Sequence, residues 1–418
     1  MIGAIFEPPV TDTTRSLGDY LARRIKMPQE SSQVATDRRP RLALIVTDVY
    51  AFNVLGRGQL EFFADQGVDL DLYCGGSQEG IAELRERDLG RVTKLKLHRE
   101  PRPFWDLIAL AQLIVCLTIN RYDGVVFSTP KAMLLGALAA AIGRQRYRVA
   151  LVRGRAYENY VGIKRRVFVA LDRLAFALAH RTVFISYSQH QAYIEDGLST
   201  RITPSEAVPG HGSSNGVDIT RFKPQSSEGR ARLRRQAGFT EDDFVIVVVG
   251  RIAPDKGAKL ALRLMREFRE DKHVKCVFVG NFEDKTLRDE IYGAKELRIR
   301  HHPACKNVED WFGLADLNFM PTSREGFGNV AIEAAASGVL TVAFNVVGLR
   351  DSVNDPVSGR LFEYGDVKAI EHEIRLIVSN REKLREQGMA ARNWAATHFA
   401  QETVWRNYLG LFLPRQFG

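Results

Sequence analysis

The sequence has few cysteines, and no two of them form a motif. Cys74, Cys116, Cys276 and Cys305 lie far apart, without a Cys-x-x-Cys pair. A zinc ribbon and a disulfide framework both need cysteines at close and regular spacing, so neither is predicted. We interpret the four side chains as reduced thiols, which are typical of a cytoplasmic protein.

Long hydrophobic runs are also missing. The two longest apolar stretches, 107–119 and 132–142, are shorter than the roughly 18 residues that a membrane span needs, and residues 1–40 hold no apolar run typical of a secretory signal. We therefore expect a cytoplasmic protein that can lie against a membrane without crossing it. For Phe104 and Trp105 we expect a place in the core, with insertion at a membrane interface as the alternative.

The composition is that of a folded soluble chain. Its 418 residues are 45% hydrophobic and 26% charged, which excludes a disordered chain and allows two to three domains of about 150 residues each. The net charge is +9, and residues 131–181 carry 11 basic side chains against only Glu158 and Asp172. This density favours a phosphate-bearing partner, such as a nucleotide, a lipid diphosphate, an anionic membrane or a nucleic acid. A solvated helix face is the alternative.

Apolar runs alternate with helical patterns along the chain, and the alternation starts anew at Phe244. It predicts an α/β fold with two doubly wound, Rossmann-like parallel sheets. The expected strands are 42–46, 68–73, 124–127, 148–152 and 182–186 in the first half, and 245–249 and 274–279 in the second. A linker rich in Pro, Gly and Ser is predicted at Thr203–Glu228.

The predicted domain organisation has four parts. Residues 1–40 form an N-terminal extension, 41–215 a first Rossmann-like domain on the acceptor side, and 216–395 a second one that binds the nucleotide. Residues 396–418 form a C-terminal helix that can cross back to the first domain. In such sheets ligands bind at the carboxyl ends of the strands, so the expected site is a cleft between the two domains.

Two turns between a strand and a helix could carry chemistry. In Gly250–Gly257, Arg251 and Lys256 can bring two cations to a bound diphosphate, and the alternative is an ordinary turn with solvent-facing charges. The order of residues does not match a Walker A loop.

The second turn, 323–334, places two glycines between two carboxylates. Gly326 and Gly328 allow a close approach of the backbone, and the amides of 327–330 open a helix. Glu325 and Glu333 can each accept paired hydrogen bonds from vicinal hydroxyls of a sugar or a ribose. For Glu333 the alternative is a partner of the helix dipole, and for Glu325 an exposed loop charge.

Taken together, these residues resemble the GT-B glycosyltransferases of the family-4 type, also called glycosyl transferases group 1. The shared elements are E-x7-E at Glu325 and Glu333, G-R-x4-K-G at Gly250–Gly257, and N-G-V-D-x3-F at Asn215–Phe222. Residues 151–159 and 211–216 resemble bacterial surface-polysaccharide members.

The resemblance implies a retaining transfer of a hexose or N-acetylhexosamine from a nucleotide-diphosphate sugar, with UDP as the expected nucleotide and no obligate metal or other cofactor. The implied acceptor is a saccharide linked to polyprenyl diphosphate, used in surface polysaccharide synthesis at the inner face of the plasma membrane. The partners would be the donor, the acceptor and an anionic membrane surface, with no nucleic acid.

The resemblance also implies roles for individual residues. Glu325, Arg251 and Lys256 would be catalytic, with the two cations holding the donor diphosphate. The expected donor-binding residues are Gly250, Gly257, Gly326, Phe327, Gly328, Asn329, Val330 and Glu333, and those on the acceptor or phosphate side are Arg153, Gly56 and Asn215. A structural role for Arg153 is the alternative.

No metal site is predicted. Asp69-Leu70-Asp71 matches an Asp-x-Asp pattern but falls in a predicted strand, and His301-His302 is expected in a loop where the two rings point apart. Two alternative functions remain: a sugar-nucleotide epimerase on the same fold and, more distantly, a nucleic-acid-binding protein that uses the basic segment.

Overall fold

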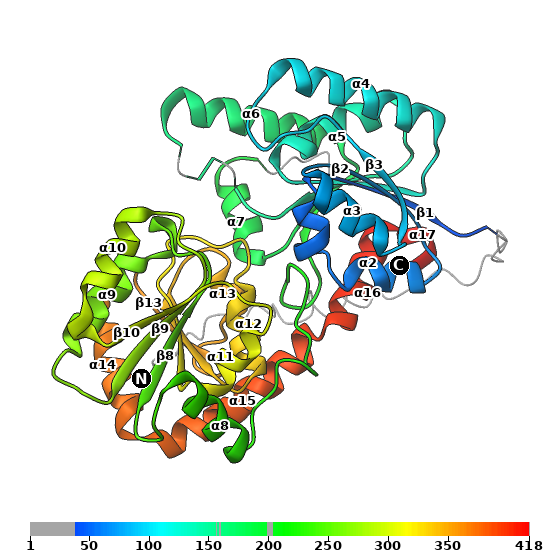
Figure 1. Ribbon diagram of the computed structural model, residues 1–418. Helices are drawn as coiled ribbons and strands as arrows, with labels where there is room; N and C mark the ends of the chain where they lie inside the picture. The colour runs from blue at the N-terminus through cyan, green and yellow to red at the C-terminus, as the bar shows by residue number, and fades with distance from the viewer. Residues whose placement is uncertain (1–37, 156, 159, 199–203, 418) are drawn as a thin grey trace, which may run out of the picture. The chain divides into compact units, whose positions relative to one another are not determined.

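The computed structural model describes residues 38–155, 157–158, 160–198 and 204–417, so nearly all of the predicted extension lies outside the described residues. The described chain contains two parallel β-sheets with helices on both faces (Figure 1). The strand order is β3-β2-β1-β4-β5-β6-β7 in the first sheet and β10-β9-β8-β11-β12-β13 in the second. This architecture confirms the predicted fold class.

The strands of the first sheet are β1 Arg41–Asp48, β2 Asp69–Gly75, β3 Gly90–Lys94, β4 Gly124–Ser128, β5 Arg148–Val152, β6 Arg181–Phe184 and β7 Ser205–Ala207. Those of the second are β8 Phe244–Val249, β9 Val274–Val279, β10 Ile299–His302, β11 Leu317–Met320, β12 Leu340–Phe344 and β13 Gly359–Phe362. β7 lies inside the predicted linker, and β10 contains His301 and His302, so the expected loop at the two histidines is wrong.

The helices of the first half are α2 Gln59–Asp65, α3 Gln78–Glu86, α4 Pro103–Ile119, α5 Pro130–Ile142, α6 Gly162–Leu178 and α7 Tyr187–Glu195. The second half contains α8 Ser227–Ala237, α9 Ala258–Glu267, α10 Lys285–Gly293, α11 Val308–Leu314, α12 Asn329–Ala336, α13 Leu349–Ser352 and α14 Val367–Ser379. The chain ends with α15 Arg381–Phe399, α16 Gln401–Phe412 and α17 Pro414–Phe417.

Strand β1 is apolar from Leu42 to Val46, and helices cover it on both sides. Leu42 and Leu44 belong to a core that includes Phe63 of α2, whereas Ala43 and Ile45 belong to a second core with α4 and α5. Side chains alternate between the two faces of a strand, so burial of both faces needs a continuous apolar run. This is the pattern that the sequence presents.

The strand order reverses between β1 and β4 in the first sheet and between β8 and β11 in the second. At such a point the connections leave in opposite directions, and the carboxyl ends of the two strands leave room for a ligand. The segments that follow these four strands are therefore the expected places for site residues.

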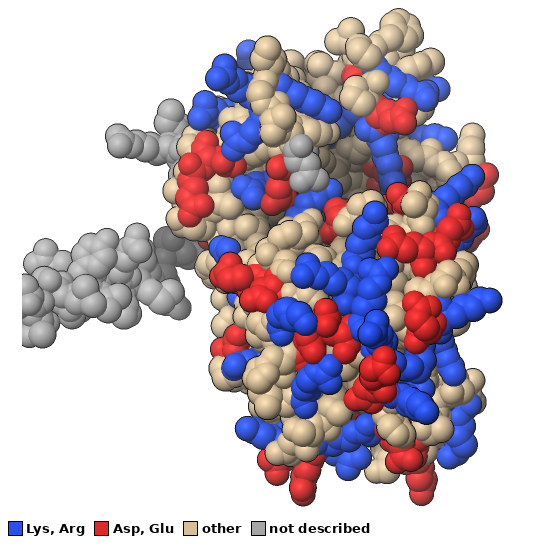
Figure 2. All heavy atoms as spheres, turned by 90° about the vertical axis from the view of Figure 1, so that its left-hand side faces the viewer, with Lys and Arg blue, Asp and Glu red and all other residues tan. Residues whose placement is uncertain are grey.

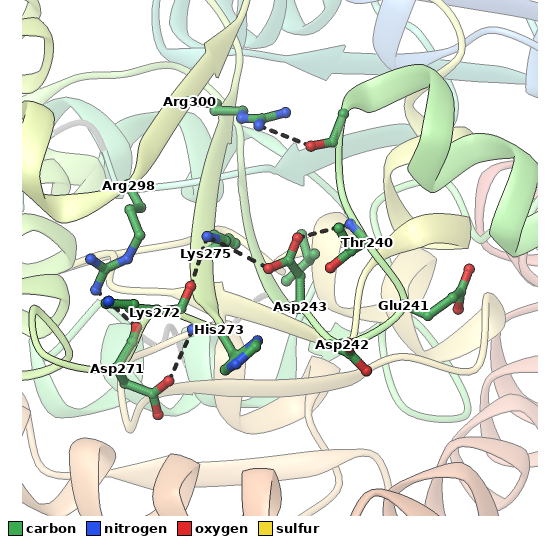
Figure 3. A network of polar contacts seen from close by, with 12 residues as sticks. Thr240, Glu241, Asp242, Asp243, Asp271, Lys272, His273, Lys275, Arg298 and Arg300 are labelled. Atoms are coloured by element: carbon green, nitrogen blue, oxygen red, sulfur yellow. Dashed lines mark hydrogen bonds and ion pairs between the residues drawn. The ribbon is translucent and has the colours of Figure 1, made fainter.

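At the amino ends of its strands, opposite the ligand side, the second sheet is flanked by loops that polar contacts hold in place (Figure 3). Before β8, the carboxylate of Asp243 accepts a hydrogen bond from the amide of Thr240 at 2.8 Å and lies 3.6 Å from the ammonium of Lys275 in β9. Before β10, the guanidinium of Arg298 donates to three backbone carbonyls of 268–271. These contacts stabilise the loops that precede β8 and β10.

The C-terminal helix α16 packs on the first sheet's helix α2. The ring centroids of Phe62 and Trp405 are 5.6 Å apart, and those of Phe63 and Phe412 are 6.2 Å apart. The chain thus returns to its first half before it ends (Figure 1). The four domain boundaries given above stay a prediction.

Helix α4 leaves two aromatic side chains at the surface. Phe104 is 68% exposed and Trp105 38%, so the expectation of a core position is wrong for both. They stand in the first turn of the helix, where the chain turns away from the core. None of the helices in the described ranges is both long and apolar enough to span a bilayer.

Candidate active site

A cavity of about 360 Å³ lies at the carboxyl ends of both sheets, and we call it the charged cavity. Its wall includes segments that follow β4, β5, β8 and β11. Among the described residues, its charged lining consists of the cations Arg153, Arg155, Arg251, Lys256 and Arg324 and the carboxylates Glu158, Asp255 and Glu325. The excess of cations suits an anionic ligand such as a diphosphate.

Lys256 and Glu325 meet at the centre of this lining. The Lys256 ammonium donates to Glu325 Oε1 at 2.5 Å, and both side chains are largely buried. The turn that carries Lys256 is tight: Gly257 has φ +74°, and a Cβ there would lie 2.0 Å from the carbonyl oxygen of Pro321. Glycine is therefore required at this position to bring the lysine next to β11.

Asp255 stands between two arginines. Its carboxylate lies 3.4 Å from Arg251 and 3.3 Å from Arg324, and Arg251 also pairs with Glu283. Burial raises the pKa of Asp255, but Arg251, Arg324 and Lys256 outweigh it and hold the pKa below its usual value. The carboxylate thus stays ionised and fixes the two guanidinium groups at the cavity wall.

Arg153 brings a partly buried cation from the segment after β5. Its guanidinium donates to the hydroxyl of Ser214 at 3.0 Å, and no carboxylate within the described ranges forms an ion pair with it. Burial lowers the pKa of Arg153. The hydrogen bond to Ser214 fits a structural role and the place in the cavity wall fits a phosphate contact, so the predicted phosphate contact of Arg153 stays a prediction.

Gly326 is the point where the segments after β5 and β11 touch. A Cβ on Gly326 would lie 2.3 Å from the carbonyl oxygen of Arg153. The Gly326 carbonyl also accepts a hydrogen bond from the hydroxyl of Ser186 at 2.9 Å. A second such contact joins α7 and α13, where the Ser188 amide donates to Asp351 at 3.0 Å.

The segment after Gly326 begins helix α12. Gly328 is the N-cap residue with φ +84°, and the first helical residues are Asn329 and Val330. Phe327 is buried and its ring packs against that of Phe399 at 5.5 Å. These residues do not line the charged cavity, and their predicted contact with the donor stays a prediction.

Glu333 lies on α12, outside the charged cavity. Burial raises the pKa of its carboxyl to about 7, opposed by the positive charge of Arg221. Arg221 is itself paired with Glu309 at 2.6 Å. The side chain is therefore easily protonated near neutral pH, and its assignment to the donor ribose is untested.

The raised pKa predicts a pH-dependent stability. Because the folded protein binds this proton more tightly than the unfolded chain, the stabilising contribution of Glu333 is present below pH 4.5 and is lost as the pH rises through about 7. Glu333→Gln should lose less unfolding free energy between pH 5 and pH 8 than the parent, by up to about 3 kcal/mol. Urea unfolding at both pH values measures this, with the exposed Glu270→Gln as control. Equal losses in parent and Glu333→Gln would contradict the raised pKa.

Other predicted site residues also lie outside the lining of the charged cavity. Gly250 and Gly257 flank the turn that carries Arg251 and Lys256. Gly56 ends the short helical turn after β1. Asn215 has a structural contact set: its amide donates to the carbonyl of Arg57 at 3.1 Å, and its side-chain oxygen accepts from the indole of Trp405 at 2.8 Å.

Sequence reasoning missed several residues of the lining. Thr129 follows β4, Arg155 follows β5, and Asp255 and Arg324 lie within or beside the recognised motifs. The signal that could have found Thr129 and Arg155 is their place directly after apolar strands, at the carboxyl edge of a parallel sheet. Asp255 could have been found because it separates the two cations of its motif.

Several basic side chains of the segment 131–181 form ion pairs with carboxylates. Arg155 and Arg165 both pair with Asp196, and Lys131 pairs with Asp106 at 2.9 Å. Figure 2 shows Lys and Arg side chains mixed with Asp and Glu over the face that it displays.

Asp71 of the Asp-x-Asp pattern is occupied by structural contacts. It forms an ion pair with Arg91 at 2.7 Å and accepts a hydrogen bond from the hydroxyl of Tyr122. It belongs to β2, as the sequence predicts, and does not line the charged cavity.

Two Rossmann-like halves whose carboxyl edges share one cation-rich cavity define the class of GT-B enzymes. The family description "Glycosyl transferases group 1" matches residues 229–394, and "Glycosyl transferase 4-like domain" matches residues 57–206. The capsular polysaccharide biosynthesis glycosyltransferase CapM of Staphylococcus aureus is 30% identical over 371 residues, which cover 86% of this chain and 93% of CapM. The chain therefore belongs to the group 1 glycosyl transferases and is a glycosyltransferase.

Solved structures show the same fold. HepE of Anabaena, in its complex with UDP-glucose, superposes with a TM-score of 0.71 at 20% identity and covers 89% of this chain and 98% of its own. A glycosyltransferase from Rickettsia africae gives a TM-score of 0.72 at 16% identity, with 90% and 98% covered. At these identities the likeness concerns the fold alone.

Proposed function

We propose that the protein transfers a hexose or N-acetylhexosamine from a UDP-sugar to a polyprenyl-diphosphate-linked saccharide, with retention at the anomeric carbon, in surface polysaccharide synthesis. The observation that carries the proposal is the meeting of Arg153, Arg251, Lys256 and Glu325 in one cavity. The name of CapM supports the polysaccharide pathway, and the UDP-glucose complex of HepE supports the donor class.

In the proposed reaction, the bond between the anomeric carbon and the donor diphosphate breaks, and the acceptor hydroxyl oxygen forms the new bond on the same face. The hydroxyl proton passes to the departing phosphate. Arg251 and Lys256 stabilise the negative charge that develops on the diphosphate, and Glu325 holds hydroxyls of the transferred sugar. Such preorganised charge is typically the largest contribution to catalysis.

The surface of α4 and α6 supports a membrane-bound acceptor. Leu107, Val115 and Ile119 are each more than half exposed, and α4 carries no charged side chain between 107 and 119. The neighbouring α6 adds exposed basic residues next to the exposed Ile163. Apolar side chains beside cations are typical of a helix surface that lies on anionic lipid. This surface supports our proposal that the enzyme acts at the inner face of the plasma membrane.

A donor screen tests the proposal. We expect UDP and UDP-sugars to raise the Tm of the purified protein by several degrees, and GDP- and ADP-sugars to do so less, because bound ligand stabilises the folded state. Transfer to a lipid-linked acceptor should continue in the presence of a chelator, since Arg251 and Lys256 supply the positive charge. Absence of any nucleotide-induced shift would refute the donor site, and loss of transfer with chelator would refute the metal-independent reaction.

Product analysis distinguishes the proposed transferase from the alternative, a sugar-nucleotide epimerase. An epimerase would release an altered free sugar or sugar nucleotide in the absence of acceptor, whereas the proposed transferase forms a glycosylated lipid only when acceptor is present.

A further inference from the structure

A second cavity, of about 520 Å³, adjoins the charged cavity on the side of the first sheet. Its wall is formed mainly by Tyr50 after β1, Leu134 of α5, Tyr160, and Phe168 and Leu171 of α6, and we call it the apolar cavity. Its volume falls within the range of about 300–1,000 Å³ that ligand sites occupy. The donor proposed above is polar and anionic, so this wall suits a different ligand.

The two cavities share part of their lining. Leu55, Thr129 and Pro130 belong to the walls of both. A molecule that occupied the apolar cavity would therefore have its near end beside the charged cavity, where the transferred sugar is proposed to lie.

Thr129, which lines both cavities, has a strained backbone. Its φ is +71°, a conformation that a β-branched residue rarely adopts. The strain is held by Thr47, whose amide donates to the Thr129 hydroxyl at 2.9 Å. Strained residues that the surrounding structure holds in place concentrate at binding and catalytic sites.

The carboxyl group on the apolar wall is compatible with an apolar ligand. Asp172 is only 7% exposed, and its carboxyl accepts a hydrogen bond from the hydroxyl of Tyr193 at 3.3 Å. Burial raises the pKa of Asp172 to about 7, so much of this group is uncharged near neutral pH.

Two cations complete the lining. Arg99 lies 3.3 Å from Asp48, and Lys131 lies 2.9 Å from Asp106. Each cation is thus paired with a carboxylate, and Asp48 itself belongs to the lining. The wall combines apolar side chains with ion pairs, which suits an apolar chain that continues into a polar group. α6, which forms one wall, also belongs to the surface that we place on the membrane.

We propose that the apolar cavity binds the proximal part of the acceptor's prenyl chain, so that the saccharide at its end reaches the charged cavity past Thr129. This inference rests on the proposed function. It assigns the apolar cavity as the acceptor-lipid subsite, and it makes the enzyme selective for a saccharide that carries a lipid over the same saccharide without one.

Kinetics with two acceptors test the subsite. One acceptor carries the saccharide on a prenyl diphosphate and the other carries the same saccharide on a methyl group. We expect the parent to show a KM at least about tenfold lower for the prenyl acceptor. Leu171→Gln and Leu134→Gln, which place an amide in the apolar wall, should raise that KM about tenfold and leave the KM for the methyl acceptor unchanged.

Leu376→Gln is the matched control, because Leu376 is an exposed leucine on α14 in the other half of the chain. It should leave both KM values unchanged. The methyl acceptor reports on folding, since a misfolded variant would lose transfer to both acceptors. A cavity variant that retains normal KM for the prenyl acceptor would overturn the assignment.

Binding of dansylated farnesyl diphosphate in detergent-free buffer gives a readout that is independent of transfer. The parent and Leu376→Gln should bind the probe, and Leu171→Gln about tenfold more weakly. If the parent binds the probe at this cavity but transfers sugar to neither acceptor, the proposed function fails and the subsite stands. If it transfers sugar to both acceptors with equal KM and does not bind the probe, the proposed function stands and the subsite is wrong.

Discussion

Lys256→Ala is expected to lower kcat/KM about 10²- to 10³-fold while the Tm changes by only a few degrees. The Lys256 ammonium lies 2.5 Å from Glu325 in the charged cavity, where the departing diphosphate would gain negative charge. Loss of one preorganised group that stabilises developing charge costs about 3–4 kcal/mol of transition-state stabilisation. Initial rates at saturating acceptor and calorimetry measure the two quantities.

Lys259→Ala is the matched control for this experiment. Lys259 is an exposed lysine on α9, three residues further along the same segment, and it does not line the charged cavity. Its replacement should leave kcat/KM within about twofold, in keeping with the small effects of surface substitutions. A Lys256→Ala enzyme as active as the Lys259→Ala enzyme would remove Lys256 from the catalytic groups.

Most central strands could be predicted from the sequence because parallel strands buried on both faces are almost wholly apolar. The central strands β11 and β12 are missing from the predicted strands, although both are fully buried. The predicted 245–249 and 274–279 differ from β8 and β9 by at most one residue. Edge strands do not carry this signal. β3 is half exposed and reads Gly-Arg-Val-Thr-Lys, and β10 contains two histidines, so the sequence predicted neither as a strand.

The candidate site could be predicted in part. Arg251, Lys256 and Glu325 belong to two short motifs that follow buried strands, and both motifs reach the charged cavity. The contacts of Asn215 could not be predicted, since its side chain meets Arg57 and Trp405, each more than 150 residues away in the chain. Such pairings depend on how the halves fold together and leave no local pattern.

The exposed aromatic pair on α4 shows a further limit of prediction from the sequence. Phe104 and Trp105 stand next to an apolar run, and sequence alone cannot tell an apolar helix face that is buried from one that lies on a membrane. The structure shows that one side of α4 is exposed, because α5 and the sheet cover only the other side.

The close contact between the backbones of Arg153 and Gly326 leads to the second prediction with a large expected effect on the rate. Gly326→Ala is expected to lower kcat/KM about 10²-fold, because its Cβ would lie 2.3 Å from the Arg153 carbonyl oxygen and one of the two segments must move. Arg153 and Glu325 flank this contact, so the movement would separate the cation and the carboxylate for which we propose contacts with phosphate and sugar. The KM for the donor should rise together with the fall in kcat.

Gly293→Ala is the matched control, because a Cβ at Gly293 would have no neighbouring atom within 4 Å. Its rate and Tm should equal those of the parent. For Gly326→Ala, circular dichroism should show a folded protein, since the contact joins two loops and lies outside the strands of both sheets. A folded Gly326→Ala enzyme with the parent's rate would mean that the close approach of these loops is not needed to assemble the site, and the charged cavity would then have to work with its two halves further apart.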